Sequence, residues 1–174
     1  MRTEIRICGF GGQGIILAGV ILGEAASRAG FQAVQTQSYG PESRGGAARS
    51  EVVISDGPVD YPRVTRADVI VALSQPALDR YAGDLADGGD VIVDGDLVAG
   101  ENTIGQPFQR TAEDVGHKIV TNIVMLGYLA AHTDLVPAEV LEATVLRNVP
   151  AGTEELNKKA LAAGRRLFEE GGAA

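Results

Sequence analysis

The stretch IRICGFGGQGIILAG, residues 5–19, decides the fold of this chain. It places four glycines within six residues, between a run that alternates like a β-strand and a run with helical spacing. Three of these glycines fit G-x-G-x-x-G, a spacing that lets a backbone turn sharply beneath a phosphate at a helix N-terminus. The candidate ligand contacts in this glycine loop are Gly9, Gly11, Gly12, Gln13 and Gly14.

The flanking residues predict a β-strand, an α-helix and a second strand. We expect strands over residues 4–8 and 31–37, and between them a helix from residue 15 that is closed by Gly30. This order predicts a βαβ start. The helix face expected to be buried consists of Ile16, Leu17, Val20, Ile21 and Ala25.

Further strands are expected over residues 51–55, 67–74 and 88–95. Residues 67–74 form an almost entirely apolar run, typical of a parallel sheet covered on both faces, and residues 88–95 are expected to form another buried strand, bounded by glycines. Ser74 is expected to cap the next helix, with Pro76 in its first turn.

The last third of the chain has helical spacing throughout. Thr111 and Asp114 have the spacing of a capping box and predict a helix start. Two more helices are expected over residues 137–148 and 153–170, either covering the sheet or forming a subunit interface. The helix that begins at Thr111 is expected to bury Ile119, Ile123, Leu126 and Leu129 on one face. The whole pattern predicts an α/β, Rossmann-like fold in a single domain, residues 1–174, with a mostly parallel sheet flanked by helices and a helical C-terminal region.

Composition disfavours several classes of function. A net charge of −8 and 5% aromatic residues disfavour nucleic-acid binding, which needs a cationic surface and stacking platforms. A single cysteine, Cys8, cannot ligate an iron–sulfur cluster alone and is expected in the core. His117 and His132 lack the spacing of a helical zinc site and any identifiable acid partner, so we expect no metal. With no apolar run long enough to span a bilayer, we expect a cytoplasmic protein.

One part of a dinucleotide site is missing. The acid that usually holds the ribose at the end of the second strand is replaced by Val34, Gln35, Thr36 and Gln37. Three interpretations of the glycine loop therefore stay open. It holds a dinucleotide, it holds another phosphate-bearing ligand, or it only packs strand against helix.

A second loop, SYGPESRGG, follows the second strand. It leaves the sheet edge where doubly wound folds bind ligands, so it is either a solvated surface loop or a ligand or subunit contact. Arg44 offers a planar guanidinium to a phosphate or carboxylate. The candidate residues are Tyr39, Gly40, Pro41, Glu42, Ser43, Arg44, Gly45 and Gly46. Neither loop carries a nucleophile beside a base, so we predict no catalytic residue and a binding module rather than a self-sufficient enzyme.

These two loops together carry a family resemblance. GFGGQGIILAGVILGEAA followed by TQSYGPESRGGAARSEVVIS resembles the gamma subunit of 2-oxoacid:ferredoxin oxidoreductases, and the later stretches ADVIVALSQPAL and NIVMLGYLAAHTDLVPAEVLEATV are similar to it too. The resemblance spans nearly the whole chain. The second loop resembles the 2-oxoglutarate type, with the pyruvate and 2-oxoisovalerate types close.

The resemblance implies a subunit that needs partners. Enzymes of this family oxidatively decarboxylate a 2-oxoacid with thiamine diphosphate and coenzyme A, and pass electrons through iron–sulfur clusters to ferredoxin. It implies that thiamine diphosphate with Mg²⁺ and the clusters lie in alpha, beta and delta partner subunits. Here the glycine loop would face coenzyme A phosphates, with Arg44, and Arg49 behind it, as basic contacts. The alternatives are a non-catalytic assembly module and a stand-alone dinucleotide-binding oxidoreductase.

Overall fold

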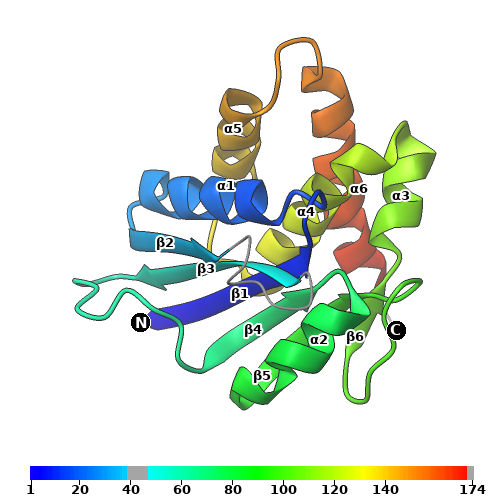
Figure 1. The fold of residues 1–174 in the computed structure, drawn as a ribbon. Coiled ribbons are helices and arrows are strands. Elements are labelled where there is room, and N and C mark those ends of the chain that lie inside the picture. Colours follow the sequence, from blue (N-terminus) through cyan, green and yellow to red (C-terminus); the bar gives the residue numbers. More distant parts are fainter. Residues whose placement is uncertain (39–46, 172–174) are drawn as a thin grey trace.

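The computed structural model describes residues 1–38 and 47–171, and Figure 1 shows it as a ribbon. Its centre is a six-stranded sheet in the order β2-β3-β1-β4-β5-β6. The strands are β1 (Arg2–Phe10), β2 (Gln32–Ser38), β3 (Ala47–Ser55), β4 (Ala67–Ala72), β5 (Leu85–Asp94) and β6 (Ile104–Gln106). The helices are α1 (Ile15–Arg28), α2 (Gln75–Tyr81), α3 (Phe108–Val115), α4 (Thr121–Thr133), α5 (Ala138–Asn148) and α6 (Glu154–Gly171). The predicted α/β class is confirmed.

Half of the sheet is parallel, as the apolar runs predict. β1 pairs with β4, β4 with β5 and β5 with β6, each in parallel. Along β4, Val69 and Val71 join one apolar cluster, whereas Ile70 and Ala72 join the cluster on the opposite face. Because both faces are covered, nearly every position of this strand is apolar.

The other half corrects the expected βαβ start. β2 does not pair with β1, because β3 lies between them and is antiparallel to both. β3 is longer than predicted, because it begins at Ala47. It pairs with the whole of β1, from Arg2 opposite Ser55 to Phe10 opposite Ala47, and so takes the edge of β1 that β2 would have needed. The result is a split βαβ unit in which β1 and β2 still run parallel, one strand apart.

Helices cover the sheet unequally (Figure 1). α1, α4, α5 and α6 lie over one face, and α2 lies over the other. The larger apolar cluster joins the sheet to α1, α4, α5 and α6, and the smaller cluster lies under α2. Among residues 1–38 and 47–171, no helix combines the length and apolar composition needed to cross a membrane.

The buried face of α1 differs from the prediction. Ile21 and Ala25 are buried as expected, but Ile16, Leu17 and Val20 are only half-buried. The buried residues of α1 include Gly19 and Gly23, which lie where the backbone of the helix comes close to β3. A Cβ on Gly19 would collide with the Ser50 side chain.

The first of the late helices also differs from the prediction. It does not start at Thr111, which lies inside α3 with its N–H bonded to the Pro107 carbonyl at 2.9 Å. α3 ends at Val115 with Gly116 as its C-cap, and a 3-10 turn, η4 (Lys118–Val120), precedes α4. The turn leaves Ile119 72% exposed, whereas Ile123, Leu126 and Leu129 are buried as predicted.

Other predicted elements are confirmed. Ser74 caps α2 by accepting a hydrogen bond from the Ala77 N–H, and Pro76 lies in the first turn. Helices α5 and α6 fall within about a residue of the expected limits. The sequence reading missed two short elements, β6 and the 3-10 turn η3 (Ala82–Asp84).

Candidate functional site

The glycine loop lies at the carboxyl ends of the two central parallel strands. β1 ends at Phe10, beside Ala47 at the start of β3. On the other side the N–H of Leu73, just after β4, donates to the Cys8 carbonyl at 2.9 Å. Ligands of open α/β sheets bind at such an edge.

Gln13 holds the loop in shape. Its Oε1 accepts a hydrogen bond from the Phe10 N–H at 2.6 Å, and its Nε2 donates to the Leu73 carbonyl at 3.0 Å. Its backbone N–H also donates to the Phe10 carbonyl at 3.2 Å. The Gln13 amide is therefore engaged within the protein, and its position favours a scaffolding role over direct ligand contact.

The glycines of the loop do different things. Gly12 and Gly14 have φ values of +89° and +72°, which L-residues with a Cβ adopt at a cost. Gly14 caps α1, and its carbonyl accepts a hydrogen bond from Asn122 Nδ2 at 3.3 Å. Gly11 has ordinary φ and open space around it. Backbone strain thus accounts for Gly12 and Gly14, but nothing in the described packing requires a glycine at position 11.

The first turn of α1 is uncapped by any side chain. Its leading N–H groups point out of the helix end, where the helix dipole favours an anion. Next to them is a cavity of about 400 Å³, with Phe10 at its edge 45% exposed. It is lined by Phe10, Gly11, Gly12, Gly14, Ile15, Ile16, Leu17 and Ala48. Such a surface can bind a phosphate through backbone N–H groups and an apolar chain through the side chains.

The second loop lies outside the described residues. This applies to Tyr39, Gly40, Pro41, Glu42, Ser43, Arg44, Gly45 and Gly46. The residues on either side are placed, however. Ser38 lies opposite Arg49, and Ala47 lies opposite Phe10. These flanking residues, Ser38 and Ala47, therefore lie at the same edge of the sheet as the glycine loop.

Arg49 lies on the opposite face of the sheet from the cavity. Its neighbour Ala48 lines the cavity, so the alternation of β3 turns Arg49 toward α2. There its guanidinium stands 5.7 Å from the centre of the Tyr81 ring and 3.7 Å from Glu51. The prediction that Arg49 lies behind the glycine loop as a basic contact is therefore wrong.

Cys8 is a core residue, as predicted. Its side chain is fully buried, and Sγ donates to the Val71 carbonyl at 3.2 Å. Burial raises the pKa of the thiol to about 12, although the nearby Arg6 charge opposes this shift. A thiol so protected is neither a nucleophile nor a ready metal ligand. In the part of the chain that the structure describes, no group of three or more His, Cys, Asp or Glu side chains could hold a metal ion.

The two histidines make contacts that the sequence did not reveal. His132 has an acid partner that the sequence did not reveal, since its Nε2 lies 2.9 Å from Asp90 Oδ2 on β5. It also stacks on Tyr128, with ring centres 6.0 Å apart. His117 is not helical, and its Nδ1 accepts the Ile119 N–H at 3.0 Å to cap η4. Both contacts are structural.

Asn122 is the site residue that sequence reasoning missed. It lies at the start of α4, 108 positions from Gly14, to which it donates. No local pattern signals such a contact. It fixes the end of α1 against α4, so the glycine loop is supported from β4 through Gln13 and from α4 through Asn122.

Comparison with known proteins gives one consistent picture. The profile of the family described as pyruvate ferredoxin/flavodoxin oxidoreductase matches residues 4–167. The 2-oxoglutarate synthase subunit KorC of Methanocaldococcus jannaschii is 52% identical, over 98% of this chain and 96% of that protein.

Two solved structures are similar to this fold. The gamma subunit of a keto/oxoacid ferredoxin oxidoreductase from Geobacter sulfurreducens has a TM-score of 0.87 and 50% identity, covering 100% of this chain and 98% of that one. The 2-oxoglutarate:ferredoxin oxidoreductase of Magnetococcus marinus, solved with 2-oxoglutarate, coenzyme A and succinyl-CoA bound, has a TM-score of 0.87. At 23% identity, over 97% of this chain and 31% of that one, this second likeness is one of fold.

Proposed function

This chain belongs to the pyruvate ferredoxin/flavodoxin oxidoreductase family, and on that premise we propose that it is the gamma-type subunit of a 2-oxoglutarate:ferredoxin oxidoreductase. The observation that carries the proposal is the 52% identity to a 2-oxoglutarate synthase subunit over almost the full length of both chains. The enzyme would oxidatively decarboxylate 2-oxoglutarate, form succinyl-CoA and pass the electrons to ferredoxin. We propose that residues 1–174 act in it as one gamma-type domain, in the cytoplasm.

The side chains that could bind a cofactor in this chain fit some of the expected cofactors and not others. A single buried thiol and the lack of a metal-binding side-chain group in the described residues do not fit iron–sulfur clusters or a thiamine diphosphate–Mg²⁺ site. We therefore assign those groups to the alpha, beta and delta partner subunits. Thiamine diphosphate supplies the decarboxylation chemistry there, and this chain supplies none of it.

Coenzyme A fits the glycine-loop cavity better. Its phosphates match the uncapped first turn of α1, and its pantetheine arm matches the apolar wall formed by Phe10, Ile16 and Leu17. The lack of an acid at the end of β2 also suits coenzyme A, because its ribose carries a 3′-phosphate that a carboxylate would repel. Arg44 remains the proposed cationic contact from the second loop.

Gly11 provides the sharpest test of coenzyme A binding. Because it has ordinary φ and open space, Gly11→Val should fold normally while its side chain enters the cavity. Calorimetry on the assembled complex should show coenzyme A bound about tenfold or more weakly. Gly57→Val is the matched control, since Gly57 is equally free of neighbours and lies in the turn after β3, at the opposite end of that strand from Ala47.

Two rival functions predict different results. An assembly module without a coenzyme A site predicts unchanged affinity in Gly11→Val. A stand-alone dinucleotide enzyme predicts NAD- or flavin-dependent turnover by the isolated chain, whereas we expect that chain to be colourless and inactive. Co-purification of a thiamine-diphosphate-binding partner with this chain would support the proposed subunit.

A further inference from the structure

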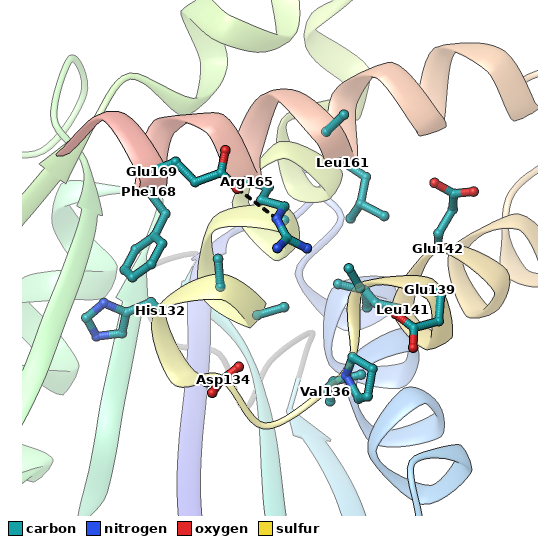
Figure 2. Close-up of a pocket in the computed structure, with 16 residues that line it drawn as sticks. His132, Asp134, Val136, Glu139, Leu141, Glu142, Leu161, Arg165, Phe168 and Glu169 are labelled. Atoms are coloured by element: carbon teal, nitrogen blue, oxygen red, sulfur yellow. Dashed lines mark hydrogen bonds and ion pairs between the residues drawn. The ribbon is translucent and has the colours of Figure 1, made fainter. Parts of the chain in front are cut away.

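A second, larger cavity lies away from the glycine loop and plays no part in the proposed coenzyme A site. It is an open groove of about 740 Å³ between the C-terminal half of α4, the start of α5 and the C-terminal half of α6 (Figure 2). Its floor is formed by small and apolar residues: Gly127, Ala130, Ala131, Val136, Leu141, Leu161 and Ala162. We call it the three-helix groove.

Two walls of the three-helix groove, α4 and α6, are packed tightly against each other. α4 and α6 cross with their backbones in contact, because Gly127 faces the Leu161 carbonyl and Gly164 faces the Val124 carbonyl with no room for a Cβ. Tyr128 and Phe168 pack edge to face across the same pair of helices, with ring centres 5.8 Å apart. The crossing of α4 and α6 therefore fixes the relative position of these two sides of the groove.

The rim of the groove is acidic. Asp134, Glu139, Glu142 and Glu169 line it, against a single cation, Arg165. Arg165 is already paired with Glu169 at 2.9 Å, drawn as a dashed line in Figure 2. Asp134, Glu139 and Glu142 are exposed and form no ion pair within residues 1–38 and 47–171. An apolar floor between unpaired carboxylates is complementary to a segment that carries a row of apolar side chains flanked by Lys or Arg.

We propose that the three-helix groove docks an amphipathic helix of a partner subunit, with apolar residues on the floor and Lys or Arg side chains against Asp134, Glu139 and Glu142. The inference rests on the proposed function, which requires such partners. A strand is disfavoured because the groove is lined by helices and by the connection between α4 and α5, which offer no sheet edge to pair with. A second copy is disfavoured because a two-fold contact would oppose the same carboxylates on both copies.

The test measures association of the full-length chain with its purified partner subunits at several salt concentrations. The double variant Glu139→Lys/Glu142→Lys should weaken association about tenfold or more and flatten its salt dependence. The matched control is Asp60→Lys/Glu101→Lys, which changes the charge equally at exposed carboxylates outside the groove that form no ion pair among the described residues. The control should retain wild-type affinity.

A second variant tests the groove by its volume, without changing any charge. Ala162 is exposed on the floor of the groove, so Ala162→Trp should fold and fill the space a partner helix would occupy. It should also weaken association about tenfold, with little change in salt dependence. Coenzyme A affinity of the complex that still forms should match wild type, because the groove and the glycine-loop cavity share no lining residue.

The outcomes separate the two proposals. If wild type binds its partners and the groove variants bind equally well, or if the control weakens binding as much as they do, the groove is not the docking site. A change in self-association of the isolated chain on Ala162→Trp would assign the groove to a second copy and overturn the inference. If wild type binds no partner at all, the proposed function itself fails.

Discussion

Gln13 Nε2 donates a hydrogen bond to the Leu73 carbonyl at 3.0 Å, and this bond ties the glycine loop to the end of β4. The same side chain accepts the Phe10 N–H at 2.6 Å. One amide thus satisfies two backbone groups that the sharp turn of the loop leaves without a ladder partner. The glutamine within GFGGQG is a structural part of the motif.

Removing this amide should loosen the loop. Gln13→Leu leaves the Phe10 N–H and the Leu73 carbonyl without their partner, so we expect the free energy of unfolding to fall by about 1–3 kcal/mol. Urea unfolding of the isolated chain measures this. Gln32→Leu on the exposed face of β2 is the control, expected within about 0.5 kcal/mol of wild type. Equal losses in the two variants would show that Gln13 has no special role.

Two glycines of the loop should respond differently to the same substitution. Gly14 has a φ of +72° and faces the Asn122 side chain, so Gly14→Ala should cost about 2 kcal/mol or more through strain and crowding. Gly11→Ala should leave the stability within about 0.5 kcal/mol of wild type, since nothing crowds that position. Thermal unfolding of both variants compares them directly, and a loss at Gly11 as large as at Gly14 would contradict the loop geometry.

Cys8 predicts a specific dependence of stability on pH. Burial raises the pKa of its thiol to about 12 in the folded chain, against an ordinary value near 9.0. Between these values the unfolded chain releases the proton and the folded chain keeps it. The contribution of Cys8 to folding is therefore fully present below about pH 9 and falls by about 1.4 kcal/mol per pH unit above it.

Comparison with Cys8→Ala isolates this effect, because lysines and tyrosines titrate in the same range in both proteins. The stability difference between wild type and Cys8→Ala should stay constant from pH 6 to about 8 and shrink as the pH rises through 10. A difference that stays flat up to pH 10 would mean that the thiol ionises without unfolding. Thiol reagents should also label the native chain only through unfolding.

Local sequence patterns predicted much of the fold for a physical reason. The burial of both faces of β4 makes residues 67–72 apolar at every position but Asp68, and the Ser74 cap needs only the next three residues. Both features depend on residues that are close together in the sequence. The position of β3 between β2 and β1 is not, because it depends on pairing between strands some 40 residues apart.

The candidate site shows the same division. The glycines could be predicted because the turn itself demands them, as at Gly12 and Gly14. Asn122 and the His132–Asp90 pair could not, because their partners lie 108 and 42 positions away. The misjudged face of α1 has a similar cause. Apolar spacing favoured Ile16 and Val20, but the close approach of β3 selects small residues such as Gly19.

The crossing of α4 and α6 should be the least tolerant of added volume. Gly164 lies inside α6, where alanine would normally favour the helix by about 1 kcal/mol over glycine. Its missing Cβ, however, points at the Val124 carbonyl of α4, a backbone atom that cannot rotate aside. Gly164→Ala should therefore separate the helices and lower the free energy of unfolding by about 2 kcal/mol, or roughly 5 °C in Tm. Gly83→Ala, where open space surrounds the glycine, should leave Tm unchanged. If Gly164→Ala proved stabilising, helix propensity would outweigh the contact, and the two helices would not be locked by backbone packing.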